Sequence, residues 1–459
     1  MNFYDGLEQY DGNIALVHDG KTMTYAGLAA QADRVAACLP ARSLVFLACQ
    51  NSPEVPVGYL GMLRRRAVPV LVNPALHEEL LRNLMETYRP NYMWCPQAFW
   101  PGEALVTYGD YKLVALDREM PDMDPALALL LTTSGSTGSP KLVRQTYENI
   151  DSNTDAIVQY LGIRPEDRAI TTLPMSYTYG LSILQSHLAA GARLILTEKT
   201  FLQKEFWELF RREQATTFGG VPYTYEMLDR LRFLRMELPS LRYVTQAGGK
   251  LSKELHFKFA DGLRKMGCAF VVMYGATEAT ARMAYVPAEM AVEKAGSIGV
   301  AIPGGRFELM DVDGSIIGTP GQVGELVYYG RNVTQGYAQS RADLSKGDEW
   351  HGRLETGDMA MFDADGYYYV VGRKKRFLKL YGNRVNLMEL EGLLAAAGFA
   401  CACVGEDDHL QAYTTSEDLE GVVDFLAETT HINRAAFRAI HIDAIPRNEA
   451  GKVLYSELK

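Results

Sequence analysis

Short apolar segments alternate with amphipathic segments through most of the first 300 residues, and this alternation restricts the fold more than any other feature of the chain. Short, uniformly apolar runs predict buried strands, whereas apolar residues at helical spacing predict helices. The predicted strands are residues 43–49, 67–72, 126–131, 194–196 and 270–274, and the predicted helices are residues 58–65, 183–190 and 253–266. Strands that alternate with helices form largely parallel sheets covered by helices. The chain is therefore predicted to be an α/β protein with mixed, largely parallel sheets.

The C-terminal part of the chain follows a different pattern. Glycine and proline interrupt short strands between residues 299 and 327, which is typical of a small antiparallel barrel or sheet. The basic run Arg373-Lys374-Lys375-Arg376 follows a predicted hairpin and precedes a compact segment of alternating helix and strand. At 459 residues the chain is longer than one average domain. We predict a large domain over residues 1–373 with a small β-barrel-like subdomain, and a small α+β domain over residues 374–459.

A loop rich in glycine and hydroxyl side chains follows the predicted strand at residues 126–131. It runs from Thr133 to Lys141 with the sequence Thr-Ser-Gly-Ser-Thr-Gly-Ser-Pro-Lys. The backbone N–H groups and hydroxyls of such a loop can turn toward a polyanion, and the lysine adds a positive charge. The spacing rejects the P-loop of nucleoside triphosphatases, because that motif counted from Gly135 needs a glycine where Pro140 stands. By itself the loop is equally typical of a linker.

Four further motifs follow this loop. They are Tyr-Gly-Ala-Thr-Glu at residues 274–278, Thr-Gly-Asp at 356–358, Gly-Arg-Lys-Lys at 372–375, and Pro-Arg-Asn at 446–448 followed by Gly451 and Lys452. In this order the motifs resemble those of the adenylate-forming superfamily, and the likeness runs from about residue 50 to the C-terminus. That superfamily comprises acyl- and aryl-CoA synthetases, the adenylation domains of nonribosomal peptide synthetases, and luciferases. The resemblance implies that the protein activates a carboxylate with ATP as an acyl-adenylate and releases pyrophosphate.

The resemblance also implies where the nucleotide binds. The expected phosphate-binding residues are Thr133, Ser134, Gly135, Ser136, Thr137, Gly138 and Lys141. The residues expected at the adenine and ribose are Gly248, Gly249, Tyr274, Gly275, Asp358 and Arg373. A carboxylate such as Asp358 suits the ribose hydroxyls because both of its oxygens accept hydrogen bonds.

Three residues are expected to act on the reacting groups. The Thr277 hydroxyl can bond the α-phosphate, and the Glu278 carboxylate is the hard oxygen ligand that Mg²⁺ prefers. By resemblance, Lys452 reaches the carboxylate and α-phosphate oxygens, where a cation stabilises charge that builds in the transition state. The same resemblance implies that residues 374–459 form a mobile lid with its hinge at Lys375. Two lid orientations would then serve two half-reactions, adenylation first and thiol transfer second.

The pocket for the carboxylic acid is expected between two motifs. Residues 173–181 resemble one wall and residues 218–223 resemble a second wall. The expected pocket residues are Tyr177, Tyr179, Phe218, Gly219, Tyr223 and Ala247. Tyr177 stands where many acyl-CoA synthetases have histidine, which leaves the identity of the acid open. The peptide-synthetase adenylation domains that the chain resembles hold the α-ammonium group of an amino acid with an aspartate in the segment that corresponds to residues 176–180. Since no acidic residue lies there in this chain, the resemblance implies an aryl or acyl acid without an α-amino group.

The thiol acceptor has two candidates. The first is CoA, which would make the protein an AMP-forming acyl- or aryl-CoA synthetase with ATP, Mg²⁺ and CoA as its cofactors. The second is the phosphopantetheine of an acyl or peptidyl carrier protein, because residues 380–385 resemble the lid motif of carrier-loading enzymes. A non-catalytic binding protein on the same fold is a third hypothesis, and the presence of Glu278, Asp358 and Lys452 argues against it.

Composition narrows the partners and the compartment. The formal net charge of −10 argues against a nucleic-acid surface, which would be basic. The sequence contains no apolar run long enough to span a bilayer and begins without a secretory signal pattern. Its six cysteines lack disulfide or metal-binding spacing, and we expect buried free thiols in a cytoplasmic protein: Cys38, Cys49, Cys95, Cys268, Cys401 and Cys403.

Overall fold

The structure is a computed structural model that divides into two compact units. The residues that it describes are 2–76, 78–117, 119–132, 141–311, 313–381, 383–447 and 453–458. The first unit contains residues 1–306 and 329–354, and the second contains residues 307–328 and 355–459. The sequence predicts a boundary between residues 373 and 374, where a mobile C-terminal domain would begin. This boundary describes a movement rather than a compact unit, and it stays a prediction.

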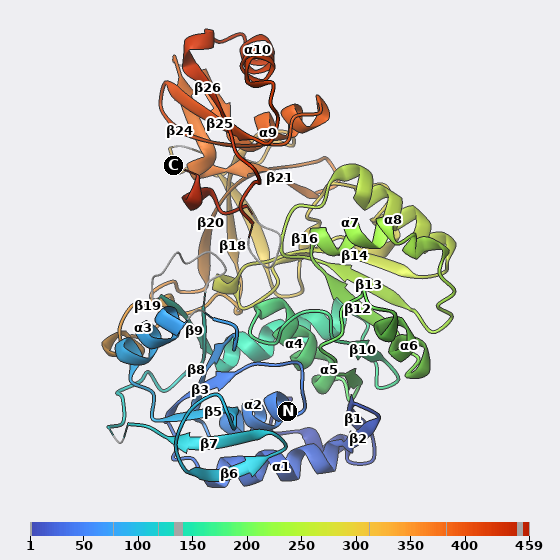
Figure 1. The fold of residues 1–459 in the computed structure, drawn as a ribbon, viewed down its shortest axis with the longest axis vertical. Coiled ribbons are helices and arrows are strands. Elements are labelled where there is room, and N and C mark those ends of the chain that lie inside the picture. The colour runs from blue at the N-terminus through green and yellow to red at the C-terminus, as the bar shows by residue number, and fades with distance from the viewer. Residues whose placement is uncertain are drawn as a thin grey trace. The chain divides into compact units, whose positions relative to one another are not determined.

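An eight-stranded sheet forms one half of the first unit (Figure 1). Its strands are β3 (Leu44–Ala48), β4 (Val68–Val72), β5 (Tyr92–Pro96), β6 (Ala104–Tyr108), β7 (Tyr111–Ala115), β8 (Leu127–Thr132), β9 (Leu142–Thr146) and β19 (Tyr337–Ala338). They lie in the order β19-β9-β8-β4-β3-β5-β7-β6. The central strands β8, β4, β3 and β5 are parallel, and the flanking strands are antiparallel. The uniformly apolar sequences of β3 and β4 follow from burial on both faces.

A nine-stranded sheet forms the other half of the first unit. Its strands are β1 (Ile14–His18), β2 (Lys21–Thr24), β10 (Arg168–Ile170), β11 (Arg193–Ile195), β12 (Thr217–Gly220), β13 (Tyr243–Gln246), β14 (Ala269–Tyr274), β15 (Ala284–Tyr285) and β16 (Val300–Ala301). They lie in the order β16-β15-β14-β13-β12-β10-β11-β1-β2, and the strands from β14 to β1 are parallel. The carboxyl ends of β12, β13 and β14 therefore meet at one edge of the sheet, where parallel α/β sheets place their ligands.

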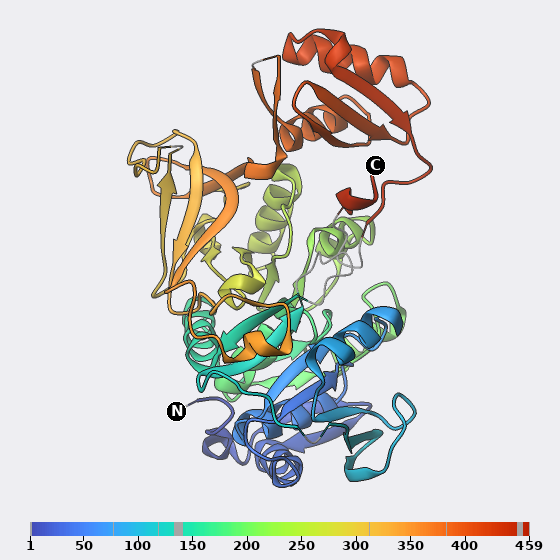
Figure 2. The ribbon, with the colours of Figure 1, turned by 90° about the vertical axis from the view of Figure 1, so that its left-hand side faces the viewer.

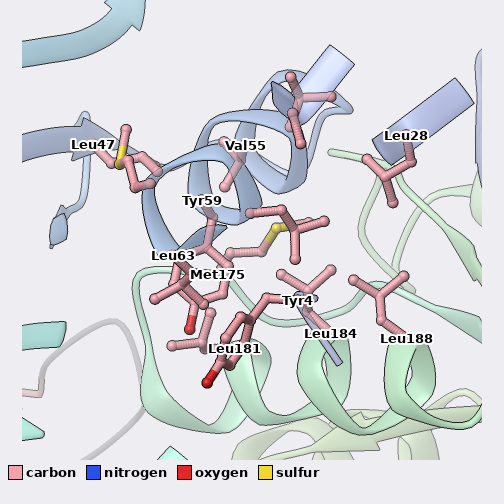
Figure 3. Packing of buried hydrophobic residues seen from close by; sticks show 14 of the residues in the cluster. Tyr4, Leu28, Leu47, Val55, Tyr59, Leu63, Met175, Leu181, Leu184 and Leu188 are labelled. Atoms are coloured by element: carbon pink, nitrogen blue, oxygen red, sulfur yellow. The ribbon is translucent and has the colours of Figure 1, made fainter. Parts of the chain in front are cut away.

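Eight helices connect these strands and cover them within the described part of the unit. They are α1 (Tyr25–Ala37), α2 (Glu54–Arg64), α3 (Glu78–Tyr88), α4 (Tyr147–Leu161), α5 (Thr178–Ala189), α6 (Lys204–Arg212), α7 (Pro222–Arg230) and α8 (Lys253–Lys265). Figure 3 shows Tyr59 and Leu63 of α2 packed near Leu181 and Leu184 of α5 in the main hydrophobic core. The buried Tyr59 hydroxyl accepts a 2.8 Å hydrogen bond from Gln185 Nε2, which joins α2 to α5. Residues 55–63 of α2 are buried all round, as expected for a helix inside a core.

The second unit begins with a four-stranded sheet in the order β17-β18-β20-β21. Its strands are β17 (Arg306–Met310), β18 (Gly324–Tyr329), β20 (Arg353–Phe362) and β21 (Tyr368–Arg373). The C-terminal segment then contains β22 (Phe377–Leu380), β23 (Asn383–Asn386), α9 (Leu387–Ala396), β24 (Cys401–Glu406), β25 (His409–Thr414), α10 (Leu419–Thr430) and β26 (Phe437–His441). Figure 2 shows α9 and α10 beside the three-stranded sheet β24-β25-β26, and their apolar residues share one core with β24, β25 and β26.

The predicted fold class is confirmed. Each predicted strand overlaps an observed strand, and its two ends lie within two residues of the observed ends. Each predicted helix also overlaps an observed helix. The helix predicted at residues 58–65 begins earlier, at Glu54, because Val55 and Val57 extend its buried face. Of the region predicted as a small antiparallel barrel or sheet, residues 306–310 and 324–327 enter the four-stranded sheet of the second unit. The six cysteines are free thiols, four of them buried.

Candidate active site

The turn after β14 carries Thr277 and Glu278. A Cβ added at Gly275 would lie 1.8 Å from the Ala281 carbonyl oxygen, so only glycine allows the chain to fold back so closely. The short 3₁₀ helix Thr277–Ala279 follows at once. Thr277 is buried and Glu278 is partly exposed. A hydroxyl and a carboxylate are thus presented together at the carboxyl end of a parallel strand.

Side chains from distant parts of the sequence hold this turn in place. Asn332 Nδ2 donates hydrogen bonds to the carbonyl oxygens of Ala279 (2.9 Å) and Arg282 (2.8 Å). Gln145 Nε2 donates a 3.3 Å hydrogen bond to the Thr277 carbonyl. These contacts fix the backbone beneath Thr277, and a fixed backbone is what a preorganised site needs.

Thr280 has a backbone conformation that a β-branched residue rarely adopts. Its φ is +63°, and both its backbone carbonyl and its side-chain hydroxyl are hydrogen-bonded. Thr178 Oγ1 donates a hydrogen bond to the Thr280 carbonyl, and Thr280 Oγ1 donates one of 2.7 Å to the Asn332 carbonyl. Such local strain persists only where surrounding contacts impose it, and it concentrates at functional sites.

Glu278 is connected to Lys141 through the side chain of Tyr337. The Tyr337 hydroxyl donates a 2.8 Å hydrogen bond to Glu278 Oε1. Burial and then the neighbouring Glu278 charge raise the pKa of Tyr337, so the phenol stays protonated and acts as the donor. Lys141 Nζ lies 3.3 Å from the centroid of the Tyr337 ring, within cation–π range. The structure therefore brings together two of the predicted nucleotide-site residues, Lys141 and Glu278, through Tyr337.

The rest of the predicted phosphate loop lies outside the described residues. This applies to Thr133, Ser134, Gly135, Ser136, Thr137 and Gly138. Their assignment to the phosphates stays a prediction.

The glycine pair predicted near the adenine follows β13 and is also held in place. Gln246 Nε2 donates hydrogen bonds to the carbonyl oxygens of Ala247 (3.2 Å) and Gly249 (3.0 Å). Gly248 has a φ of +85°, and a Cβ there would lie 2.5 Å from the Tyr177 hydroxyl. Glycine is therefore required for Tyr177 to lie over this turn. Tyr274 and Gly275, at the end of the adjacent strand β14, are partly exposed.

In the second unit, Asp358 and Arg373 form an ion pair between β20 and β21. Arg373 Nε lies 2.6 Å from Asp358 Oδ1, and the two residues are directly paired in the strand register. Asp358 is buried, whereas the Arg373 side chain is 61% exposed. The two residues predicted to bind the ribose are therefore adjacent.

The predicted hinge and the lid lysine belong to the second unit. Lys375 lies in the 3₁₀ helix Lys374–Arg376 directly after β21, and its side chain is outside the described part of the chain. Lys452 also lies outside the described residues. The described residues on either side of it are paired: an antiparallel bridge joins Arg447 to Val453, and Leu454 N donates a 2.9 Å hydrogen bond to the Pro446 carbonyl.

A small cavity of about 20 Å³ lies among several of the predicted pocket residues in the first unit. Tyr179, Phe218 and Gly219 line it. Tyr177 and Ala247 pack with Tyr179 in the adjoining hydrophobic cluster. Tyr223, the second residue of α7, does not line the cavity and is 47% exposed.

The sequence analysis missed the one arginine in the cavity lining, Arg282. Its side chain is buried, with 3% of the residue exposed. The guanidinium carbon lies 4.1 Å from the Tyr179 ring centroid, and Nη2 donates a 3.0 Å hydrogen bond to Ser182 Oγ. Its signal in the sequence is a single charge in the otherwise uncharged run of residues 279–286.

A magnesium ion fits the residues at the turn. In the described part of the chain, no three His, Cys, Asp or Glu side chains converge on one point. Magnesium bound beside substrate phosphates needs only one or two protein carboxylates, and water and phosphate oxygens complete its shell. The partly exposed Glu278, with Oε1 held by Tyr337, meets that requirement.

None of the helices in the described ranges is both long enough and apolar enough to cross a bilayer.

Comparison with known proteins gives one family for most of the chain. The profile of the family described as "AMP-binding enzyme" matches residues 3–338. Among curated proteins, indoleacetate–CoA ligase of Aromatoleum aromaticum is 29% identical over 85% of this chain and 80% of its own length. The 2-succinylbenzoate–CoA ligase of Bacillus subtilis is 26% identical over 97% and 94%. A linear gramicidin synthase polypeptide of Brevibacillus parabrevis is 25% identical over 98% of this chain, which spans only 6% of that protein.

Solved structures agree on the fold. O-succinylbenzoate coenzyme A synthetase from Bacillus subtilis in complex with AMP superposes with a TM-score of 0.80 at 22% identity and covers 100% of this chain and 98% of its own. The anthranilate CoA ligase AuaEII in complex with anthranoyl-AMP gives a TM-score of 0.77 at 20% identity and covers 100% and 96%. At these identities the likeness establishes the fold alone.

Proposed function

Because the chain belongs to the AMP-binding enzyme family, we propose that it is an ATP-dependent acid–thiol ligase that adenylates an acyl or aryl carboxylic acid and transfers the acyl group to CoA. The observation that carries the proposal is the turn after β14. There the Glu278 carboxylate accepts a hydrogen bond from Tyr337, the Lys141 ammonium group lies over the ring of that tyrosine, and a buried contact holds the backbone at Thr277.

The proposed first half-reaction is a substitution at phosphorus. A carboxylate oxygen of the acid attacks the α-phosphorus of ATP, the bond to the bridging oxygen breaks, and acyl-AMP and pyrophosphate form. Thr277 would donate a hydrogen bond to the α-phosphate, and Lys141 and Lys452 would stabilise the charge that moves onto the phosphate oxygens. Glu278 would hold Mg²⁺, which supplies further charge neutralisation when bound. Asp358 and Arg373 would orient the ribose.

The proposed second half-reaction forms a thioester. The sulfur of the thiol attacks the acyl carbon, AMP leaves, and the thiol proton passes to water. Two similarities favour CoA as the thiol: the chain matches proteins named as CoA ligases over 80% to 94% of their length, but matches the gramicidin synthase over only 6%. The hinge at Lys375 and a lid at residues 374–459 belong to this proposal.

Loading of a carrier protein is the second candidate, favoured by the likeness of residues 380–385 to the lid loop of carrier-loading enzymes. Two assays separate the candidates. ATP–pyrophosphate exchange with a panel of aryl, fatty and amino acids identifies the acid, and we expect exchange with acids that lack an α-amino group. Thioester formation with CoA is then compared with a set of phosphopantetheinyl carrier proteins. Transfer to a carrier without transfer to CoA would select the second candidate, and exchange with standard amino acids alone would overturn the expected acid class.

A further inference from the structure

The cavity beside Tyr179 is lined by both polar and apolar side chains. The polar ones include Arg282, Ser182, Ser186 and His187, and the apolar ones include Phe218 and Met273. A volume of about 20 Å³ has room for one or two water molecules, or for a ligand group with two oxygens. The cavity therefore suits the end of a ligand and is too small for a whole ring.

Arg282 brings a positive charge to this cavity without a carboxylate partner among the described residues. None of the ion pairs in the described part of the chain involves Arg282, and its Nε is buried without a hydrogen-bond acceptor there. Its guanidinium contacts are neutral groups: the Ser182 hydroxyl, the Ala281 carbonyl, the Tyr160 hydroxyl and the face of Tyr179.

The titratable neighbours do not supply the missing negative charge. Burial raises the pKa of Tyr179 to about 12, and it also raises the pKa values of Tyr160 and Tyr177 although Arg282 opposes the effect. All three phenols are therefore neutral at pH 7. Burial lowers the pKa of His187 to about 4, so its imidazole is neutral as well.

One carboxylate that acts electrostatically on two cavity-lining residues, Asp167, is already paired. Asp167 influences His187 and Tyr243, but Arg242 Nε lies 2.9 Å from Asp167 Oδ1 and holds that charge. Arg282 thus remains an uncompensated buried cation, which is costly unless an anion joins it. Arg282 belongs to the lining of the cavity, where an anion would meet its guanidinium group beside the Ser182 hydroxyl.

We propose that Arg282 binds a second carboxylate of the acid, so that the substrates of this ligase are dicarboxylic acids activated at the carboxylate remote from Arg282. This inference rests on the proposed ligase function and adds the substrate class. The same charge repels an α-ammonium group, which gives a second reason for excluding amino acids. Arg282 acts here as a specificity residue and takes no part in bond making.

The first test compares each diacid with its monomethyl ester, which keeps one carboxylate and has nearly the same shape. Succinate, glutarate, adipate and phthalate are assayed against their monomethyl esters by ATP–pyrophosphate exchange, and the diacids are titrated calorimetrically into the parent protein. The expected result is a preference for at least one diacid of roughly 100-fold over its ester, because the buried guanidinium is unpaired without it. The same assay is then repeated with variants. Arg282→Met should remove the preference for the diacid, and Arg282→Lys should keep part of it. The exposed Arg34→Met is the matched control and should change neither.

Stability separates a specificity role from a structural one. Since replacing a buried unpaired charge by an apolar side chain is neutral or stabilising, Arg282→Met should not lower the unfolding temperature. The preferred diacid should raise the unfolding temperature of the parent but not that of Arg282→Met. If Arg282→Met fails to fold, Arg282→Lys decides the question through its retained preference.

The outcomes distinguish the two proposals. Two results would overturn the role of Arg282 while the ligase function stands. The first is pyrophosphate exchange with monocarboxylic acids or monomethyl esters at the same rates as with the diacids. The second is a preference for diacids that persists in Arg282→Met. Calorimetry that detects no diacid binding would also overturn it. Diacid binding lost in Arg282→Met, with no exchange for any acid, would support the binding site and contradict the ligase function.

Discussion

The hydroxyl of Tyr337 donates a 2.8 Å hydrogen bond to Oε1 of Glu278, across 59 positions of the sequence. This bond connects a short edge strand of one large sheet to the turn that follows a strand of the other. It leaves the second oxygen of Glu278 for a ligand and fixes the direction in which the carboxylate points. In the proposed function, the carboxylate is therefore oriented before a metal ion binds.

Tyr337→Phe tests this orientation. Hydrogen bonds to charged groups contribute about 1.5–3 kcal/mol, so pyrophosphate exchange should fall roughly tenfold or more. The loss should appear mainly as a higher magnesium concentration for half-maximal rate. Tyr329→Phe, at another partly exposed tyrosine, which ends β18, is the control. If the two substitutions change the magnesium dependence of pyrophosphate exchange equally, Tyr337 has no part in the proposed metal site.

Glu278→Gln removes the charge but keeps the shape of the side chain. Without the hard anionic ligand, magnesium should bind more weakly and exchange should fall by about 100-fold or more at a fixed low magnesium concentration. Steady-state exchange across a magnesium titration measures this. The exposed Glu289→Gln, in the helix Ala288–Met290, should behave like the parent. A Glu278→Gln variant with unchanged magnesium dependence would contradict the assignment.

Lys452→Ala should separate the two half-reactions. Losing one preorganised cation costs about 3 kcal/mol, or roughly a hundredfold in the rate of pyrophosphate exchange. Thioester formation from supplied acyl-adenylate should be spared, because the lysine is expected at the site only in the adenylating orientation. The exposed Lys204→Ala is the control. If Lys452→Ala exchanges pyrophosphate at the parental rate, Lys452 takes no part in the mechanism. If adenylation and thioester formation are lost equally, the result contradicts two lid orientations.

Buried His187 should make the first unit sensitive to acid. Its Nδ1 lies 2.8 Å from the Ile183 carbonyl and its Nε2 lies 3.2 Å from the Tyr243 hydroxyl, so the neutral ring is fully hydrogen-bonded. Burial lowers its pKa from 6.5 to about 4. The depressed pKa means that the stabilisation is complete above pH 6.5 and is lost as pH falls toward 4, by up to ~3 kcal/mol.

His187→Gln should remove most of this pH dependence. All four tryptophans belong to the first unit, so urea unfolding followed by tryptophan fluorescence reports on that unit at pH 7, 6, 5 and 4. We expect the free energy of unfolding to fall less steeply in the variant than in the parent between pH 6.5 and 4. Parallel curves for the two proteins would show that His187 is not the group responsible.

The α/β architecture and the turn at Thr277 could be predicted from the sequence because their signals are local. Burial on both faces of a sheet leaves uniformly apolar strands, and Thr277 and Glu278 lie in one contiguous motif at the end of such a strand. The contacts that hold this turn could not be predicted, since Asn332 and Tyr337 come from segments more than 50 positions away. Only the folded chain brings them together.

The residues predicted to form the acid pocket show the same limit. Tyr223 is an aromatic residue beside predicted pocket residues, but its direction depends on the rotation of α7, and that rotation leaves it 47% exposed. Arg282 looks unremarkable in the sequence because an arginine is ordinarily solvated. Its burial beside Tyr179 is set by the turn at Thr280 and by the packing of α5, neither of which has a local signal.

The most direct test of the ligase function is the identity of the nucleotide product. The protein is incubated with ATP, Mg²⁺, an acid that supports exchange and CoA, and the nucleotides and phosphates are separated and quantified. We expect AMP and pyrophosphate in equal amounts, with acyl-CoA formed in the same proportion. Formation of ADP and orthophosphate in their place would contradict adenylation as the chemistry of this site.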